Sequence, residues 1–87
     1  MVKQKVTVRN LAGIHLKPAG TLCTEAMKFT SSITFVYKKG VANAKSVLSV
    51  LAACVKCGDE IVLQCEGKDE EEALKDLVRL IEDGLGE

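Results

Sequence analysis

The only histidine and the only proline of the chain lie close together, within residues 11–19. Proline is tolerated in the first turn of a helix, where its missing N–H would have no partner, so Pro18 predicts a helix that begins near Leu16 or Lys17. His15 then stands at or just before the N-cap, where free backbone N–H groups and the positive end of the helix dipole meet, and Lys17 adds a full positive charge. A nucleophilic ring nitrogen in such a field suits a phosphoryl group.

A lone histidine is more often a solvated or core side chain than a chemical group, and that interpretation competes with the phosphoryl site. The neighbours of His15 favour chemistry, because together they form a phosphate cradle with no other evident purpose. Gly13 fits the same interpretation, since a tight turn before the helix can require a positive φ.

The composition bounds the size and the partners of the protein. Eighty-seven residues suit one domain over residues 1–87, which leaves no room for a deep, enclosed active site. Twelve basic and twelve acidic side chains cancel, and only three side chains are aromatic, so direct nucleic-acid binding is not expected. Membrane insertion is not expected either, because no apolar run approaches the roughly 20 residues of a membrane span and the N-terminus has no signal-peptide core. We expect a cytoplasmic protein.

Four cysteines could suggest a disulfide framework, but such scaffolds are loop-rich and secreted, whereas this chain is strongly periodic. Cys54 and Cys57 have the two-residue spacing of a zinc or redox pair. One such pair without a second is a weak signal, so we expect no metal site and keep the thiol pair as a minor alternative. The other two cysteines are Cys23 and Cys65.

Hydrophobic periodicity predicts four strands and three helices. Alternating side chains predict strands over residues 2–9, 32–37, 41–43 and 61–66. Apolar residues at helical spacing predict a first helix after His15 and a second one opened by Ser46 as N-cap. Asp69 and Glu72 resemble a capping box that starts the last helix, which stops at Gly84. The order β-α-β-β-α-β-α favours an α+β fold, an open-faced β-sandwich whose four-stranded antiparallel sheet is covered on one face by three helices.

The second predicted helix is apolar nearly all round. Whichever face it turns to the core, part of Val47, Leu48 and Leu51 is left over, and a small domain that exposes such a patch usually docks it on a partner. The outer face of the first helix carries small or featureless side chains, and its glycine is either neutral or lets another surface approach closely. These residues are Lys17, Gly20, Thr21 and Thr24.

Three motifs occur in order along the chain, and together they resemble the histidine-containing phosphocarrier HPr family of the bacterial sugar phosphotransferase system. They are Gly13-Ile14-His15-x-Lys17-Pro18-Ala19, Asn43-Ala44-Lys45-Ser46-Val47-Leu48-Ser49-Val50 and Glu66-Gly67-Lys68-Asp69-Glu70. The resemblance runs over essentially the whole chain at matching spacing. The first two motifs are specific in combination, and either alone would be only suggestive.

The resemblance implies a role for each matching position. His15 matches the histidine that takes a phosphoryl group from phosphorylated enzyme I and passes it to the IIA domain of a sugar permease, with Lys17 and Pro18 beside it. The protein would be a stoichiometric carrier and not an independent catalyst, and it would need no cofactor. The partner-binding surface implied by the resemblance comprises Leu16, Gly20, Thr21, Thr24, Val47, Leu48 and Leu51.

Ser46 matches a serine that an ATP-dependent HPr kinase/phosphorylase modifies in part of the family. The modified protein then acts as corepressor for a catabolite-control transcription factor. Without the resemblance, Ser46 would be interpreted as a helix cap, worth about 1 kcal/mol.

The sequence departs from the family at Lys17, where members usually carry arginine. Arginine offers a planar fork for two phosphate oxygens, whereas lysine is a flexible point charge. The change therefore keeps the positive charge near the phosphoryl group but loses the fixed two-point hydrogen-bonding geometry. This favours an alternative in which the chain is a regulatory paralogue that acts mainly through phosphorylated Ser46. A metal or thiol redox module built on Cys54 and Cys57 is the third alternative.

Overall fold

The computed structural model describes residues 1–11 and 13–86, and its elements follow the predicted order. They are β1 (Val2–Thr7), α1 (Leu16–Ala26), β2 (Ser32–Tyr37), β3 (Gly40–Asn43), α2 (Val47–Ala52), β4 (Glu60–Glu66) and α3 (Glu70–Glu82). The strand predicted over residues 2–9 ends earlier, at Thr7, because its partner Glu60 is the first residue of β4. Beyond that point Val8 bonds to a turn instead: its N–H donates to the Asp59 carbonyl at 2.9 Å, and its carbonyl accepts the Gly58 N–H at 2.8 Å.

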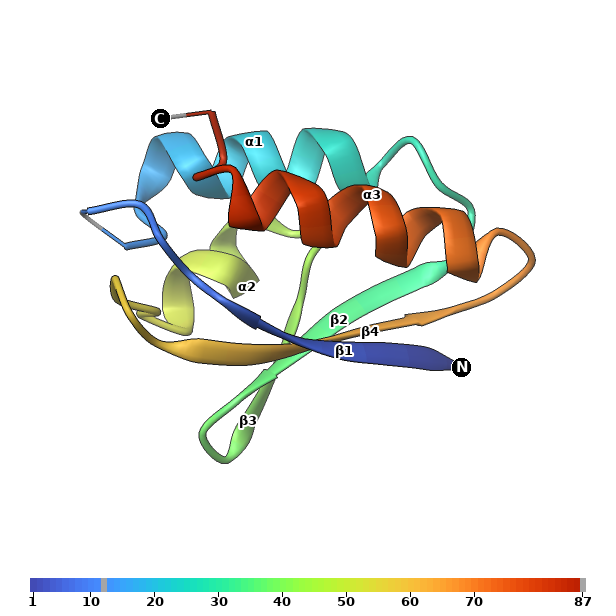
Figure 1. Ribbon diagram of the computed structural model, residues 1–87, viewed down its shortest axis with the longest axis horizontal. Coiled ribbons are helices and arrows are strands. Elements are labelled where there is room, and N and C mark those ends of the chain that lie inside the picture. Colours follow the sequence, from blue (N-terminus) through green and yellow to red (C-terminus); the bar gives the residue numbers. More distant parts are fainter. Residues whose placement is uncertain (12, 87) are drawn as a thin grey trace.

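The four strands form one antiparallel sheet in the order β1-β4-β2-β3. Across it Val6 pairs with Ile61, and Phe35 pairs with Leu63. Because side chains alternate along each strand, these residues all point to the same face and are buried. Figure 1 shows the three helices on that face, with the other face of the sheet uncovered. The predicted open-faced β-sandwich of the α+β class is confirmed.

The core lies between this face and the helices. Phe35, Leu63 and Ile61 from the sheet meet Leu22 of α1 and Leu77 of α3, and all five side chains are at most 1% exposed. Full burial of a side chain of this kind is worth roughly 1.5–3 kcal/mol, so these contacts hold α1 and α3 on the sheet. They also set where the first turn of α1 lies.

The start of α3 differs from the predicted capping box. The Asp69 carboxylate does not cap its own helix but accepts the N–H groups of Thr30 and Ser31, each at 2.9 Å, and the Ser31 hydroxyl. Those donors hold the pKa of Asp69 at about 2, with the Ser31 hydroxyl as the largest cause. Glu70 serves the helix start instead, because its carboxylate accepts the Gly67 N–H at 3.1 Å.

The end of α3 is as predicted. Gly84 has a φ of +89°, and its N–H donates to the Ile81 carbonyl at 3.1 Å, while the Leu85 N–H donates to the Leu80 carbonyl at 3.0 Å. This is the Schellman pattern that terminates helices at glycine. α3 has 13 residues, and within the described part of the chain no helix is long and apolar enough to cross a membrane.

Candidate functional site

His15 is the N-cap of α1 and is exposed to solvent. Its backbone is extended, with φ −95° and ψ −166°, and its carbonyl accepts the Ala19 N–H at 2.8 Å as the first helical bond. The predicted position of this histidine at the start of a helix is confirmed. His15 therefore directly precedes Leu16 and Lys17 in the first turn, and the N–H groups of a first helical turn have no acceptor within their own helix.

The first turn of α1 carries the positive charge expected from the sequence. Lys17 is exposed in that turn, and Pro18 follows it as a buried residue. The helix has 11 residues, so its N-terminus presents a dipole of roughly half a positive charge to an incoming anion. Backbone N–H groups, this dipole and the Lys17 ammonium make the surroundings of His15 suitable for a phosphoryl group.

The turn that carries His15 rests on the segment between α2 and β4. The Ile14 N–H donates to the Val55 carbonyl at 2.9 Å. Gly13 has a φ of +73°, and a Cβ built on it would lie 2.5 Å from the Val55 carbonyl oxygen. Only glycine fits this approach, which is the positive φ and tight turn expected at Gly13.

Asn10 also positions this turn, and the sequence reasoning did not identify it. Its side chain is 5% exposed and its amide nitrogen donates to the Gly13 carbonyl, while the Gly13 N–H donates to the Asn10 carbonyl at 2.9 Å. An asparagine three residues before a glycine is a signal for a side-chain-stabilised turn that could have suggested this. Val55 gives no comparable signal, because its role depends on a contact between distant segments.

Ser46 is the N-cap of α2, as predicted. Its hydroxyl oxygen accepts the Ser49 N–H at 3.2 Å. Asn43 braces the same turn, since its carbonyl accepts the Ser46 N–H at 3.0 Å and its side-chain oxygen accepts the Lys45 N–H at 2.9 Å. Ser46 is half-buried, so its hydroxyl lies at the surface next to the apolar residues that follow it.

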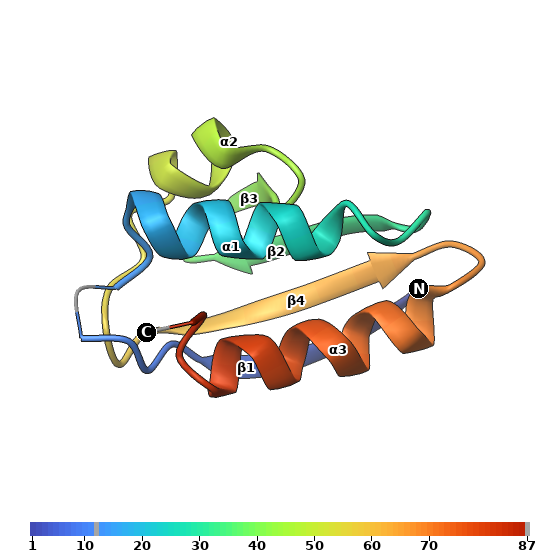
Figure 2. The same cartoon turned by 90° about the horizontal axis from the view of Figure 1, so that it is seen from above.

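Leu48 is the large apolar side chain of α2 that is mostly exposed to solvent. Val50 is fully buried, Val47 and Leu51 are half-buried against the core, and Leu48 is 80% exposed. α2 packs beside α1, as Figure 2 shows, and the Cys23 thiol donates to the Lys45 carbonyl at 3.1 Å between them.

Leu16, in the first turn of α1, is 68% exposed. Thr24 is also exposed and Gly20 is half-buried, and apart from its chain neighbours and the backbone of its own helix no described atom lies within 4 Å of a Cβ built on Gly20. No contact inside the chain therefore requires a glycine there. Thr21 lies on another flank of α1, because its methyl carbon would be 3.8 Å from a Cβ built on Gly86, beyond the end of α3.

The cysteines do not gather into a site. Cys54 and Cys57 are exposed, and their thiols lie 3.7 Å from the carbonyls of Leu51 and Arg9, respectively. Cys65 is buried, and that burial raises the pKa of its thiol to about 11. Among residues 1–11 and 13–86, no three His, Cys, Asp or Glu side chains are placed to hold a metal ion.

Comparison with known proteins gives one family. The family model described as "PTS HPr component phosphorylation site" matches residues 2–83. Phosphocarrier protein HPr of Mycoplasma capricolum is 36% identical over 75 residues, which cover 86% of this chain and 84% of that protein. The HPr-like protein Crh of Bacillus subtilis is 39% identical over 84 residues, covering 95% and 98%. The crystal structure of HPr-C-His from Thermoanaerobacter tengcongensis superposes with a TM-score of 0.95 at 38% identity, covering 100% of this chain and 98% of that one.

Proposed function

Because the chain belongs to the HPr family of phosphotransferase-system phosphocarriers, we propose that it carries a phosphoryl group on His15. The group comes from phosphorylated enzyme I and goes to the IIA domains of sugar permeases. The observation that carries this proposal is an exposed histidine at the N-cap of α1, directly before the first helical turn with its exposed Lys17. The protein acts as a stoichiometric intermediate and needs no cofactor of its own.

The transfer proceeds by in-line attack. A ring nitrogen of His15 uses its lone pair to form an N–P bond while the bond between phosphorus and the donor atom breaks, and the donor atom keeps that electron pair. The transition state is loose, with negative charge spread over three equatorial oxygens, so positioned donors matter more than an acid or a base. The N–H groups of Leu16 and Lys17 are such donors at a helix N-terminus.

Lys17 supplies charge without a fixed geometry. An ammonium attracts the phosphoryl oxygens as a point charge, whereas a guanidinium would hold two of them in a planar fork. We infer that Lys17 stabilises the transferring group less specifically than an arginine would. Pro18 contributes by fixing the start of the helix, since its ring sets φ and its missing N–H costs no helical bond.

The partners dock on the exposed ridge of α1 and on the neighbouring α2. Leu16 and Leu48 present large apolar side chains there, and Gly20 leaves an open space between them and Thr24 along the helix. Enzyme I and IIA domains would cover these residues while His15 faces the donor or the acceptor. Val47 and Leu51 are half-buried against the core and adjoin this docking surface, and Thr21 lies at its edge.

Ser46 is the regulatory position in this proposal. An ATP-dependent kinase would place a phosphate of about −1.5 to −2 charges on the hydroxyl that caps α2. A negative group at a helix N-terminus is favourable, so the helix remains formed. The charge lies next to Val47 and Leu48 and must be desolvated when a partner docks, so it weakens docking of enzyme I. The phosphorylated surface would serve as a ligand for a catabolite-control transcription factor.

A second candidate function is a regulatory protein that works mainly through Ser46. One observation favours it, which is Lys17 in place of the family's usual arginine. The two functions differ in whether His15 accepts phosphate at all.

The deciding experiment is an intact-mass measurement after incubation with phosphoenolpyruvate and enzyme I. We expect the wild-type protein to gain one acid-labile phosphoryl unit and the His15→Ala variant to gain none. Ser46→Ala is the matched control and should gain the unit like the wild type. A wild-type protein that stays unmodified while an authentic HPr is phosphorylated in the same tube would overturn the carrier function and favour the regulatory one.

A further inference from the structure

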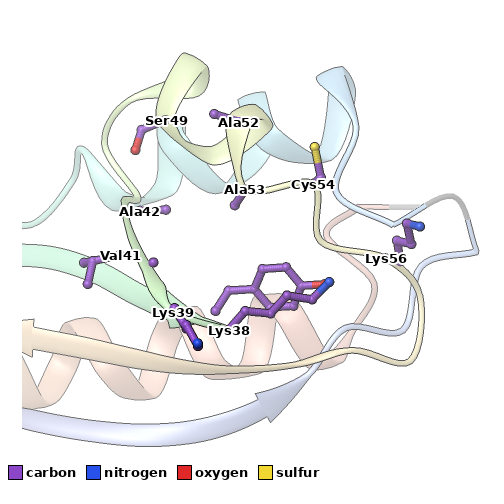
Figure 3. A pocket seen from close by; sticks show the side chains of 11 residues that line it. Lys38, Lys39, Val41, Ala42, Ser49, Ala52, Ala53, Cys54 and Lys56 are labelled. Atoms are coloured by element: carbon purple, nitrogen blue, oxygen red, sulfur yellow. The ribbon is translucent and has the colours of Figure 1, made fainter.

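A groove of about 480 Å³ lies between the β2–β3 hairpin and the segment that leads from α2 to β4. Figure 3 shows the hairpin with Lys38 and Lys39 on one side and the segment with Cys54 and Lys56 on the other. His15, Lys17 and Ser46 are not among the residues that line it. The proposed phosphocarrier function therefore makes no use of this groove.

The groove combines an apolar floor with a positively charged rim. Its lining residues include Ala42, Ala52 and Ala53 together with three lysines. These are Lys38, Lys39 and Lys56, and all three are exposed. No Asp or Glu is among the described lining residues. The Asp59 carboxylate nevertheless lies close enough to Lys38 and Lys56 for both charges to contribute, after the hydrogen bond from the Tyr37 hydroxyl, to lowering its pKa.

Asp59 braces the two walls of the groove from behind. Its carboxylate accepts the Tyr37 hydroxyl from the hairpin side and the Lys56 backbone N–H, at 2.9 Å, from the other side. The Lys38 ammonium lies 5.2 Å from the centroid of the Tyr37 ring. In Figure 3 the Lys38 side chain extends from the hairpin toward the wall that carries Cys54 and Lys56. Asp59 thus links the two walls of the groove, and one lysine is directed across it.

Both walls contain a residue in a backbone conformation that glycine adopts more easily. Lys38 has a φ of +55° in the hairpin turn, and Cys54 has a φ of +56° after α2. A two-residue hairpin turn requires a positive φ at its first residue, and the residue after a helix C-cap commonly has one, so both values follow from the turns themselves.

We propose that this groove binds a small organic phosphate monoester, at a site separate from the one at His15. Its volume falls in the range of small-ligand sites, which are roughly 300–1,000 Å³ with a mostly apolar lining and a few polar groups. A phosphate monoester concentrates about −1.5 to −2 charges in one group that several ammonium groups can approach together, while its carbon part covers the alanine floor. An acidic protein segment is disfavoured, because the lysines surround one short concave site and do not form an extended stripe.

The two exposed thiols of residues 54–57 provide a direct test. Cys54 lines the groove and Cys57, on the same segment, does not, so Cys57 is an internal control. The whole protein is alkylated with iodoacetamide, a neutral reagent, and the modification rate of each thiol is measured by peptide mass spectrometry. Glycerol 3-phosphate and phenyl phosphate are the probes, compared at constant ionic strength with inorganic phosphate and with citrate.

We expect either ester to slow alkylation of Cys54 several-fold in a saturable way and to leave Cys57 unchanged. The protection should disappear in Lys38→Ala/Lys56→Ala and persist in Lys3→Ala, an exposed lysine of β1. It should also persist in His15→Ala, which separates this site from the proposed carrier function. Amide chemical shifts of the variants confirm that each is folded and, on titration with the esters, should move for residues 38–42 and 52–56.

The proposal would be overturned if neither ester protected Cys54 or if both thiols were protected equally. It would also be overturned by protection from inorganic phosphate as strong as from the esters, by protection from citrate alone, or by protection that survives the loss of Lys38 and Lys56. Protection by inorganic phosphate as strong as by the esters would mean a bound anion without an ester site, an adventitious ion only. If an acidic peptide protected Cys54 where the esters did not, the groove would be a protein-docking site.

Discussion

The Ile14 N–H donates a hydrogen bond to the Val55 carbonyl at 2.9 Å, and this bond joins the turn that carries His15 to the segment between α2 and β4. The two residues are far apart in the sequence, and the contact brings Gly13 so close to Val55 that there is no room for a Cβ. The position of the imidazole therefore depends on the loop packed against it as well as on its own helix.

Gly13→Ala should destabilise the protein and reduce phosphoryl transfer. The left-handed backbone alone costs roughly 1–2 kcal/mol with a Cβ, and the 2.5 Å approach to the Val55 oxygen adds to that. Gly20→Ala is the matched control: outside its own helix backbone and chain neighbours its Cβ meets no described atom within 4 Å, and alanine in a helix should stabilise by about 0.5–1 kcal/mol. Urea denaturation measures the change in the free energy of unfolding for each of the two variants. Equal stability of the two would contradict the close approach at Gly13.

Lys17→Arg should speed phosphoryl transfer, and Lys17→Ala should slow it. The guanidinium fork holds two oxygens in a defined geometry, whereas alanine removes the charge that lysine provides. We expect about a tenfold change or more in each direction, since a hydrogen bond to a charged group is worth about 1.5–3 kcal/mol and each step of about 1.36 kcal/mol is a tenfold change in rate. The measurement is the single-turnover rate from phosphorylated enzyme I. Three equal rates would mean that position 17 does not act on the phosphoryl group.

Replacing Ser46 should separate its capping role from its regulatory role. Ser46→Ala loses the bond to the Ser49 N–H and should cost about 1 kcal/mol of stability while leaving transfer intact. Ser46→Asp keeps a capping oxygen and a formed α2 but adds a charge beside Leu48, so transfer from enzyme I should weaken. Circular dichroism and transfer rates distinguish the two effects. If Ser46→Asp transferred as fast as the wild type, the proposed interference with docking would be wrong.

Leu48→Ala should weaken docking without affecting the fold. The side chain is 80% exposed, so its removal should change the free energy of unfolding by less than about 0.5 kcal/mol. The KM of phosphorylated enzyme I for this protein as substrate should rise, whereas the kcat of the transfer should change little. Val41→Ala, on the edge strand β3 and 68% exposed, is the control for loss of an exposed apolar side chain. A KM unchanged by the loss of Leu48 would remove α2 from the docking surface.

The Asp69 carboxylate should make stability fall with acid. Its pKa is lowered from 3.8 to about 2, chiefly by the Ser31 hydroxyl and then by the Thr30 N–H. A lowered folded-state pKa stabilises the protein above the unfolded value, and this contribution is lost as the pH falls from about 4 through about 2. Denaturation of Asp69→Asn over that range should show a flatter pH profile than the wild type. Ser31→Ala should shift the wild-type decline to higher pH, and an unchanged profile in both variants would exclude this carboxylate as the cause.

Most of the fold and the identity of the candidate residues could be predicted from the sequence, because those features depend on local chemistry. The fixed φ of Pro18 begins α1 beside His15, the hydroxyl of Ser46 caps α2, and the positive φ of Gly84 ends α3. Each acts within one turn of its own position. The family resemblance drawn from the motifs around His15 and Ser46 is likewise confirmed.

Only the tertiary structure decided which distant groups meet. Asp69 was expected to cap α3 but binds Thr30 and Ser31, since donors nearly forty residues away are brought closer to its oxygens than those of its own helix. Val55 supports the turn before His15, and the lysines of the groove come from a hairpin and a loop that are adjacent only in space. Sequence patterns report which face of an element is apolar, but partners across the fold follow from how the helices pack on the sheet, and no local preference encodes that arrangement.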